Sequence, residues 1–315
     1  MVELNGKKIL VTFLMHLGDL TLTTPFIHAL RKAAPDAHIT MLVDEKLKDV
    51  VLFNPYLDEV VTIDKKGRDN SILSLWACSR HLSKLDFDVL INLHPNERCS
   101  FIDAMTSVKL RTGTTHKIFK WFWDVFTPLD RSMHAADMYL DVLQQLGVQD
   151  LSNNGLEIFP GEEHFLEAEL FWQEQNITDQ DKLIGFNIGS AVPTKRWPPE
   201  RFAEVADIFA AKGYKTVFFG GPMDEEMVAE ATGYMQTRPI IATGHFAIGG
   251  LAAAMRRCCL IITNDSGPMH VAISQKVPIV AMYGPSNPKL YGPYTKDAVI
   301  VTAQPPCQGC ADGMK

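Results

Sequence analysis

Short apolar runs alternate with longer amphipathic segments along most of the chain. The runs are nearly continuous and rich in β-branched residues, which is typical of strands buried on both faces. The sequence predicts strands at 8–14, 38–43, 59–63, 87–93, 108–111, 183–189, 216–219, 240–242, 260–263 and 278–282. It predicts helices at 20–33, 71–82, 135–146, 163–175, 199–212, 224–235, 251–257 and 268–274. This alternation indicates parallel sheets with helices on both faces.

The alternation is interrupted once, near the middle of the chain. The pattern loosens between residues 148 and 181 and restarts at residue 183. We therefore predict an N-terminal domain at 1–158, a linker region at 159–181 and a C-terminal domain at 182–315. A length of 315 residues suits two domains of about 150 residues each. Two similar α/β halves are expected to hold a ligand in a cleft between them.

Composition and charge narrow the class of protein. Hydrophobic residues make up 46% of the chain and charged residues 21%, so extensive disorder is excluded. The formal net charge of -7 argues against a general nucleic-acid partner. The chain shows no secretory signal, and its longest uncharged stretch, 239–255, is too short to span a membrane. We expect a cytoplasmic protein that could touch the inner face of the cytoplasmic membrane.

The six cysteines are too few and too irregularly spaced for a disulfide scaffold. Cys307 and Cys310 alone have the spacing of a metal or redox pair. One such pair supplies only two of the four ligands that structural zinc requires, and further ligands would have to lie beyond residue 315. We therefore expect structural or free thiols and no metal site.

The loop after the first predicted strand carries the first candidate chemistry. It contains Gly18, Asp19 and Thr23, followed by Thr24 and Pro25. In a parallel sheet this loop borders the ligand crevice, and a nearby helix N-terminus favours an ionised carboxylate. Asp19 is therefore a candidate catalytic group, with Gly18 allowing a tight turn. The alternative is that Asp19 only caps the helix or stabilises its first turn.

The loop after the predicted strand 183–189 has the composition of a phosphate site. Ser190 and Thr194 precede Lys195 and Arg196. Small and hydroxyl residues followed by cations suit a loop around a phosphate, with lysine as a point charge. The alternative is a solvated pair of surface cations.

Two further strand ends of the second half could contribute to the same site. Asp265, Ser266 and Gly267 open a helix whose free N–H groups favour a diphosphate. His270 lies one turn into that helix and points either at the ligand or into the core. Glu225 follows the predicted strand 216–219 and could accept hydrogen bonds from ribose hydroxyls, or it only begins a helix.

Several common catalytic signatures are absent from the sequence. No G-x-G-x-x-G follows either first strand, and there is no P-loop, H-E-x-x-H or G-x-S-x-G motif. The absence of these motifs argues against four enzyme classes: nicotinamide dehydrogenases, P-loop kinases, zinc proteases and serine hydrolases.

Four motifs occur in a fixed order between about residues 8 and 288. They are Gly18-Asp19 with Thr23-Thr24-Pro25, then Lys195-Arg196-Trp197-Pro198, then residues 265–270 and finally residues 284–288. Together they resemble glycosyltransferase family 9, the bacterial heptosyltransferases and relatives of lipopolysaccharide assembly. The resemblance implies the GT-B fold, with two Rossmann-like domains, and an inverting, metal-independent transfer. The N-terminal domain would bind the acceptor and the C-terminal domain the nucleotide-sugar.

The resemblance also implies roles for single residues. Asp19 matches the catalytic aspartate, and Lys195 matches a lysine that contacts the donor phosphates. Pro268 stands where inner-core heptosyltransferases usually have leucine, a departure that bears on the donor's identity. The predicted donor-binding residues are Ser190, Thr194, Lys195, Glu225, Asp265, Ser266, Gly267 and His270, and the predicted acceptor-binding residues are Gly18, Thr23, Arg111 and Lys117.

The resulting hypothesis is transfer of a heptose from ADP-heptose to a lipopolysaccharide-type acceptor. Asp19 would take the proton of the acceptor hydroxyl, and Lys195 would stabilise the departing diphosphate. No cofactor or metal is expected. The expected partners are the nucleotide-sugar and a glycolipid or oligosaccharide. The alternatives are a nucleotide-sugar 2-epimerase and a non-catalytic sugar-binding protein.

Overall fold

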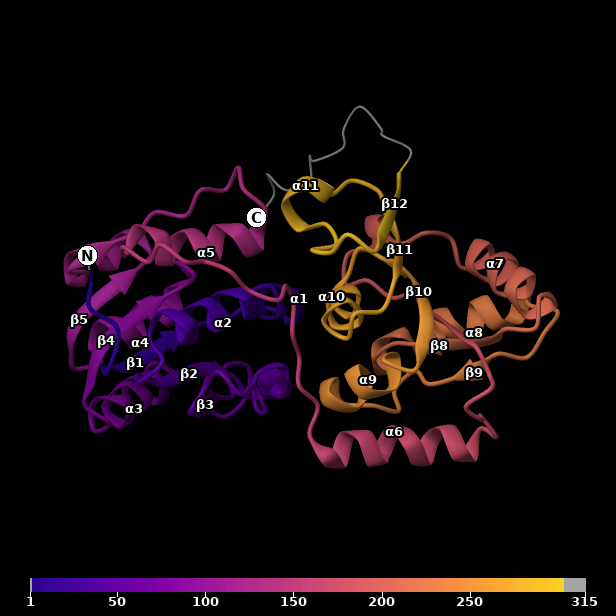
Figure 1. Cartoon of the computed structure of the whole chain (residues 1–315), viewed down its shortest axis with the longest axis horizontal. Helices are drawn as coiled ribbons and strands as arrows, with labels where there is room; N and C mark the ends of the chain where they lie inside the picture. The colour runs from indigo at the N-terminus through magenta and orange to yellow at the C-terminus, as the bar shows by residue number, and fades with distance from the viewer. Residues whose placement is uncertain (1, 303–315) are drawn as a thin grey trace. The chain divides into compact units, whose positions relative to one another are not determined.

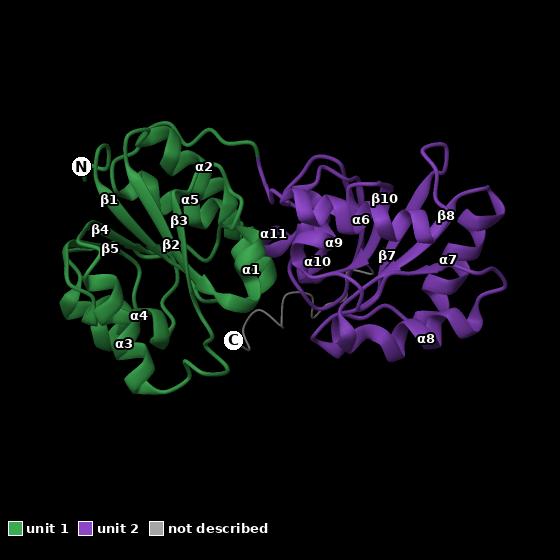
Figure 2. Ribbon diagram, turned by 90° about the horizontal axis from the view of Figure 1, so that it is seen from below, with its two compact units in different colours: residues 1–154 green, residues 155–315 purple. Residues whose placement is uncertain are grey.

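The chain forms two compact units that meet between Asn154 and Gly155 in the sequence (Figure 2). The computed structural model describes residues 2–302. Each unit contains one six-stranded sheet in which every strand pair is parallel. The predicted fold class, two parallel-sheet α/β units, is confirmed.

The first sheet has the strand order β3-β2-β1-β4-β5-β6. Its central strands carry buried side chains such as Leu10 and Leu90, which explains their nearly continuous apolar runs. Helices α3 and α4 lie side by side, and α2 packs on α5 (Figures 1 and 2). The strands are β1 (Lys8–Thr12), β2 (His38–Asp44), β3 (Glu59–Ile63), β4 (Phe87–Asn92), β5 (Val108–Gly113) and β6 (Val125–Phe126). The helices are α1 (Leu17–Thr21), α2 (Thr24–Ala33), α3 (Ile72–Ser83), α4 (Glu97–Met105) and α5 (Ala135–Gln145), with 3-10 helices η1 (Glu45–Val50) and η2 (Lys117–Phe122).

The second sheet has the strand order β12-β11-β10-β7-β8-β9. Phe186 and Phe218 stack in its core with ring centroids 5.2 Å apart, and burial of each ring contributes about 1.5–3 kcal/mol. The strands are β7 (Leu183–Asn187), β8 (Lys215–Phe219), β9 (Ile240–Ile241), β10 (Cys258–Asn264), β11 (Ile279–Tyr283) and β12 (Ala298–Thr302). The helices are α6 (Glu162–Glu174), α7 (Pro199–Ala211), α8 (Glu225–Tyr234), α9 (Ile248–Met255), α10 (Gly267–Ser274) and α11 (Pro288–Tyr291), with 3-10 helices η3 (Pro193–Lys195) and η4 (Pro222–Asp224).

The predicted helix 20–33 differs in detail from the structure, whereas the helix predicted at 163–175 is present as α6. The predicted helix 20–33 is divided into α1 and α2, because Pro25 has no N–H to donate to the Thr21 carbonyl. That carbonyl accepts from the Thr24 hydroxyl instead, at 2.8 Å. The segment 159–181, predicted as a linker region, contains α6, which packs against α9 of the second unit.

Candidate active site

Asp19 lies at the carboxyl edge of the first sheet, in the first helix after β1. From β1 the chain continues to β2 on one side, whereas β4 on the other side leads to β5. This is a topological switch point, where open parallel sheets bind ligands. The Asp19 side chain is 18% exposed, and its Oδ2 lies 3.6 Å from His16 Nδ1. His16 is the N-cap of α1, so Asp19 is not the cap, although it does lie in the first turn.

Gly18 and Thr23 belong to the helical segment that carries Asp19. Gly18 lies inside α1, so the predicted tight turn at this glycine is wrong. Thr23 is fully buried, and its hydroxyl donates to the carbonyl of Leu20 at 2.7 Å. Both residues therefore shape the helix pair that carries Asp19.

Arg111 and Lys117 differ in how far they are available to a ligand. The Arg111 guanidinium donates through Nε to the Asp103 carbonyl at 3.0 Å and through Nη2 to the Thr106 carbonyl. Arg111 thus holds the C-terminal end of α4. Lys117 is exposed at the beginning of η2.

Lys195 and Asp265 meet at the carboxyl edge of the second sheet. Lys195 Nζ lies 2.6 Å from Asp265 Oδ2, and the Ser286 hydroxyl donates to the same oxygen at 2.5 Å. The three residues follow β7, β10 and β11, which are neighbours in the sheet. Asp265 is buried and the Lys195 side chain is 21% exposed. Lys195 is therefore not a freely solvated surface cation.

Hydrogen bonds between loops bring Ser190 and Ser266 to the same strand ends. Ser190 Oγ donates to the Asp265 carbonyl at 3.3 Å. Ser266 is the N-cap of α10, and its hydroxyl accepts from Asn187 Nδ2 at 2.8 Å rather than capping the helix. Gly267 begins α10, and His270 is buried within it. The N-terminus of α10 thus lies beside the Lys195–Asp265 pair.

Thr194 and Glu225 are exposed at the same edge. Thr194 lies in η3, one residue before Lys195. Glu225 begins α8 after β8, and its Oε1 would lie 2.7 Å from a Cβ added at Gly244. Gly244 has a φ of +74°, so a side chain there would be strained as well as crowded. The Glu225 carboxylate therefore lies close to the backbone of Gly244.

A model of glycosyltransferase family 9 (heptosyltransferase) matches residues 75–314, which is more than half of the chain. The chain belongs to glycosyltransferase family 9. It is therefore a glycosyltransferase, and family membership favours sugar transfer over the epimerase and the binding protein considered above.

Relatives of this glycosyltransferase span both units. The structure of a family 9 glycosyltransferase from Veillonella parvula DSM 2008 is 55% identical, with a TM-score of 0.96 over 99% of this chain and 92% of that chain. Lipopolysaccharide heptosyltransferase 3 of Escherichia coli (strain K12) is 24% identical over 90% of this chain and 84% of its own length. The structure of E. coli ADP-heptose lps heptosyltransferase II shares the fold, with a TM-score of 0.78 at 22% identity over 93% of this chain and 90% of that chain. The GT-B architecture implied by the motifs is confirmed.

Lys65 holds the loop between β1 and α1, a role that the sequence analysis missed. Its Nζ donates to the carbonyls of Leu14 and Met15, each at 2.8 Å. It also pairs with the buried carboxylate of Asp44 at 3.2 Å. Because the Lys65 side chain is only 12% exposed, these bonds are shielded from water. Lys65 therefore fixes the backbone that leads to Asp19.

A buried carboxyl group supports the ends of β1 and β4. Asp103 Oδ2 accepts from Thr12 Oγ1 at 2.9 Å and from Asn92 Nδ2 at 2.6 Å. Burial raises the pKa of Asp103 to about 8, which outweighs the opposing effects of these hydrogen bonds and of Arg111. Asp103 is thus held mainly protonated near neutral pH. No local pattern in the sequence indicates this role of Asp103.

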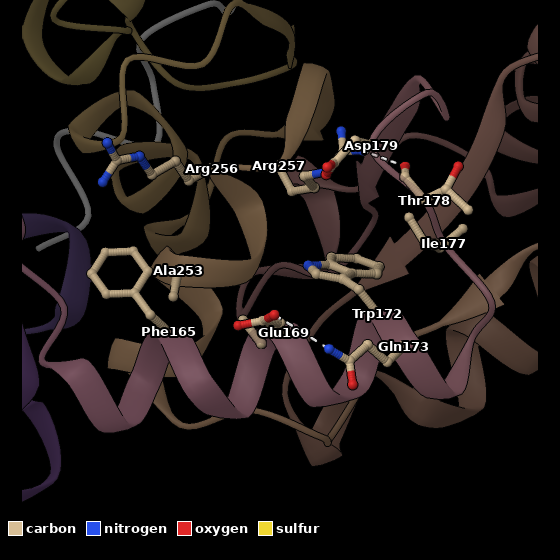
Figure 3. Close-up of a pocket in the computed structure, with 11 residues that line it drawn as sticks. Phe165, Glu169, Trp172, Gln173, Ile177, Thr178, Asp179, Ala253, Arg256 and Arg257 are labelled. Atoms are coloured by element: carbon tan, nitrogen blue, oxygen red, sulfur yellow. Dashed lines mark hydrogen bonds between the residues drawn. The ribbon is translucent and has the colours of Figure 1, made fainter.

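A pocket of about 770 Å³ in the second unit lies away from these loops (Figure 3). Its walls come from α6, α9 and the segment that leads into β7, so it lies toward the amino ends of the strands. Arg257 Nη2 donates to the Thr178 carbonyl at 2.6 Å in its wall. None of the predicted donor residues lines it. Because open parallel sheets bind ligands at the carboxyl ends of their strands, we do not assign the donor to this pocket.

Within residues 2–302, no group of three or more His, Cys, Asp or Glu residues is arranged to hold a metal ion. Nor is any helix of this range long and apolar enough to cross a membrane. Cys307 and Cys310 lie outside the described residues. The cysteines of the described range are free thiols: Cys78, Cys99, Cys258 and Cys259.

Proposed function

We propose that this glycosyltransferase moves a heptose from ADP-heptose to a lipopolysaccharide-type acceptor with inversion at the anomeric carbon. The names of its relatives support the donor and the acceptor class. The observation that carries the proposal is the cluster of Lys195, Asp265 and Ser286 beside the N-terminus of α10. A helix N-terminus with an adjacent lysine is suited to a diphosphate.

In the proposed reaction, Asp19 accepts the proton of the acceptor hydroxyl. The acceptor oxygen forms a bond to the anomeric carbon while the bond from that carbon to the diphosphate oxygen breaks. The electron pair of the broken bond leaves with ADP. Lys195 and the first N–H groups of α10 stabilise this added charge, so we propose that no metal ion is required.

We propose supporting roles for the remaining predicted residues. Ser190, Thr194 and Gly267 would contact the phosphates, and Glu225 the ribose hydroxyls. Ser266, Asp265 and His270 would shape the turn that holds them. On the acceptor side, Lys117 would meet an acidic or phosphorylated sugar, and the enzyme would act at the cytoplasmic face of the membrane.

Asp19→Asn tests the proposal, because it removes the base and keeps the side chain's shape. Transfer should fall by roughly 10²–10⁴, the usual contribution of a positioned general base. Donor affinity and melting temperature should change little, since Asp19 belongs to the first unit and Asn is tolerated in a first helical turn. The matched control is Asp36→Asn, an exposed carboxylate on the same unit. Full transfer activity in Asp19→Asn would refute the mechanism.

A further inference from the structure

An exposed aromatic segment lies at the carboxyl edge of the first sheet. The helix η2 follows β5 and buries none of its residues. Trp121 is 95% exposed and Ile118 is 66% exposed. Tryptophan is highly buried on average in folded proteins, because its large apolar surface is unfavourable in water. Such exposure indicates a surface that another molecule covers.

Side chains that point inward anchor this segment. Trp123 is buried, and its Nε1 donates to the Thr112 carbonyl at 3.1 Å. Phe119 packs edge-to-face on Phe101 of α4, with ring centroids 6.3 Å apart. These contacts fix the position of η2, so that the side chains on either side of Phe119 are exposed on an ordered segment.

The segment itself is basic, and Asp124, which follows it, accepts from the Arg111 N–H. Residues 108–123 contain four Lys and Arg residues and no Asp or Glu. Lys109 pairs with an acid of β4, and Arg111 is bonded to carbonyls of α4. Lys117 and Lys120 form no ion pair with any residue of the described range 2–302. Lys120 Nζ lies 4.5 Å from the ring centroid of Phe126.

A second exposed apolar cluster begins α3. Ile72, Leu73 and Trp76 are all exposed. The chain reaches them from the carboxyl end of β3, and α3 packs beside α4, the helix that supports η2 (Figures 1 and 2). Both clusters therefore lie toward the sheet edge that carries Asp19.

We propose that the two clusters form a membrane-docking surface for an anionic phospholipid bilayer. The surface consists of Ile72, Leu73, Ile118, Trp121, Lys117 and Lys120. Tryptophan and aliphatic side chains favour the boundary between head groups and acyl chains, and adjacent lysines attract anionic lipids. Lys117 and Lys120 favour an anionic bilayer over a second copy of this chain, because in a symmetric pair of copies the same lysines would face one another. The inference rests on the proposed function, in which the acceptor is a glycolipid.

Vesicle flotation of the full chain tests the proposal. Wild-type protein should float with phosphatidylcholine vesicles that contain phosphatidylglycerol, and added salt should weaken the binding. Trp121→Ser should lower the partition coefficient about tenfold or more. Lys117→Gln with Lys120→Gln should lower it by roughly fivefold per lysine. The matched controls in the second unit, Met223→Ser and Lys212→Gln with Lys215→Gln, should bind like wild type.

Three outcomes would overturn the docking surface. They are absence of wild-type binding to anionic vesicles at low salt, full binding by Trp121→Ser, and a lipid-free dimer that Trp121→Ser dissociates. Binding is measured without donor or acceptor, and Asp19→Asn should float like wild type. Failure of docking is therefore distinguishable from failure of the proposed transfer reaction.

Discussion

The buried carboxyl group of Asp103 should make the stability of the first unit depend on pH. Burial raises the pKa of Asp103 to about 8, compared with 3.8 for the ordinary group. The folded unit therefore keeps a proton that the unfolded chain releases above about pH 4. Below that pH both states hold the proton, and Asp103 contributes no pH dependence.

The sign and size of the effect follow from proton linkage. Between about pH 4 and pH 8 the folded unit binds one more proton than the unfolded chain, so its stability falls as pH rises. Each pH unit lowers the free energy of unfolding by about 1.4 kcal/mol. Between about pH 5 and pH 7 the loss is about 3 kcal/mol, a large share of a typical stability of about 5–15 kcal/mol.

Asp103→Asn should remove this pH dependence, because the amide stays neutral and still offers an oxygen to Thr12 and Asn92. Hydrogen exchange of peptides from β1 and β4 reports on the stability of the first unit. As pH rises, wild type should lose stability relative to the variant. Glu97→Gln, an exposed change on the same helix, should leave the slope as in wild type. Parallel pH curves for wild type and Asp103→Asn would refute the reasoning.

Three other predictions concern the donor site, the first sheet and the metal. Lys195→Ala should weaken ADP binding by about 10- to 100-fold, because a charge-assisted contact contributes about 1.5–3 kcal/mol. If Lys195 only neutralises Asp265, adding Asp265→Asn will restore ADP binding, which calorimetry can measure. Gly113→Ala should lower the unfolding free energy by about 2 kcal/mol or more, since φ is +93° and the new Cβ would lie 2.2 Å from the Asn92 carbonyl oxygen. Gly6→Ala, with φ +66° and open space, should cost less in urea unfolding. Transfer should persist after EDTA treatment, and a loss reversed by added Mg²⁺ would contradict the proposed metal-free mechanism.

The strands could be predicted because the local sequence of each one reflects its burial. Residues 8–12 and 183–187 are buried at every position except Lys8, and their apolar residues follow one another directly, as strands covered on both faces require. Helix α4 was missed because its polar beginning and its apolar residues show no clear helical period. Its start is set by Asn96, whose Oδ1 accepts from the Cys99 N–H at 2.8 Å.

The proximity of Lys195 and Asp265 in the proposed donor site was easier to predict than the support of Asp19. Lys195 and Asp265 each follow a strand of one parallel sheet, so topology alone brings them to one edge. Lys65 belongs to a charged run at 64–69 that has the composition of a solvated loop. Its burial depends on Asp44 and on two backbone carbonyls far away in the sequence, and no local pattern records such contacts.

The two edges therefore hold their key side chains in different ways. Asp265 accepts from the lysine that is proposed to contact the donor, so binding a diphosphate would compete with an ion pair already present. Asp19 is instead supported indirectly, because Lys65 bonds the backbone before α1 and Asp103 bonds the end of β1. Positioning through buried bonds leaves the Asp19 carboxylate itself partly exposed. Such an arrangement suits a base whose backbone is held in place while part of its carboxylate stays accessible to an acceptor hydroxyl.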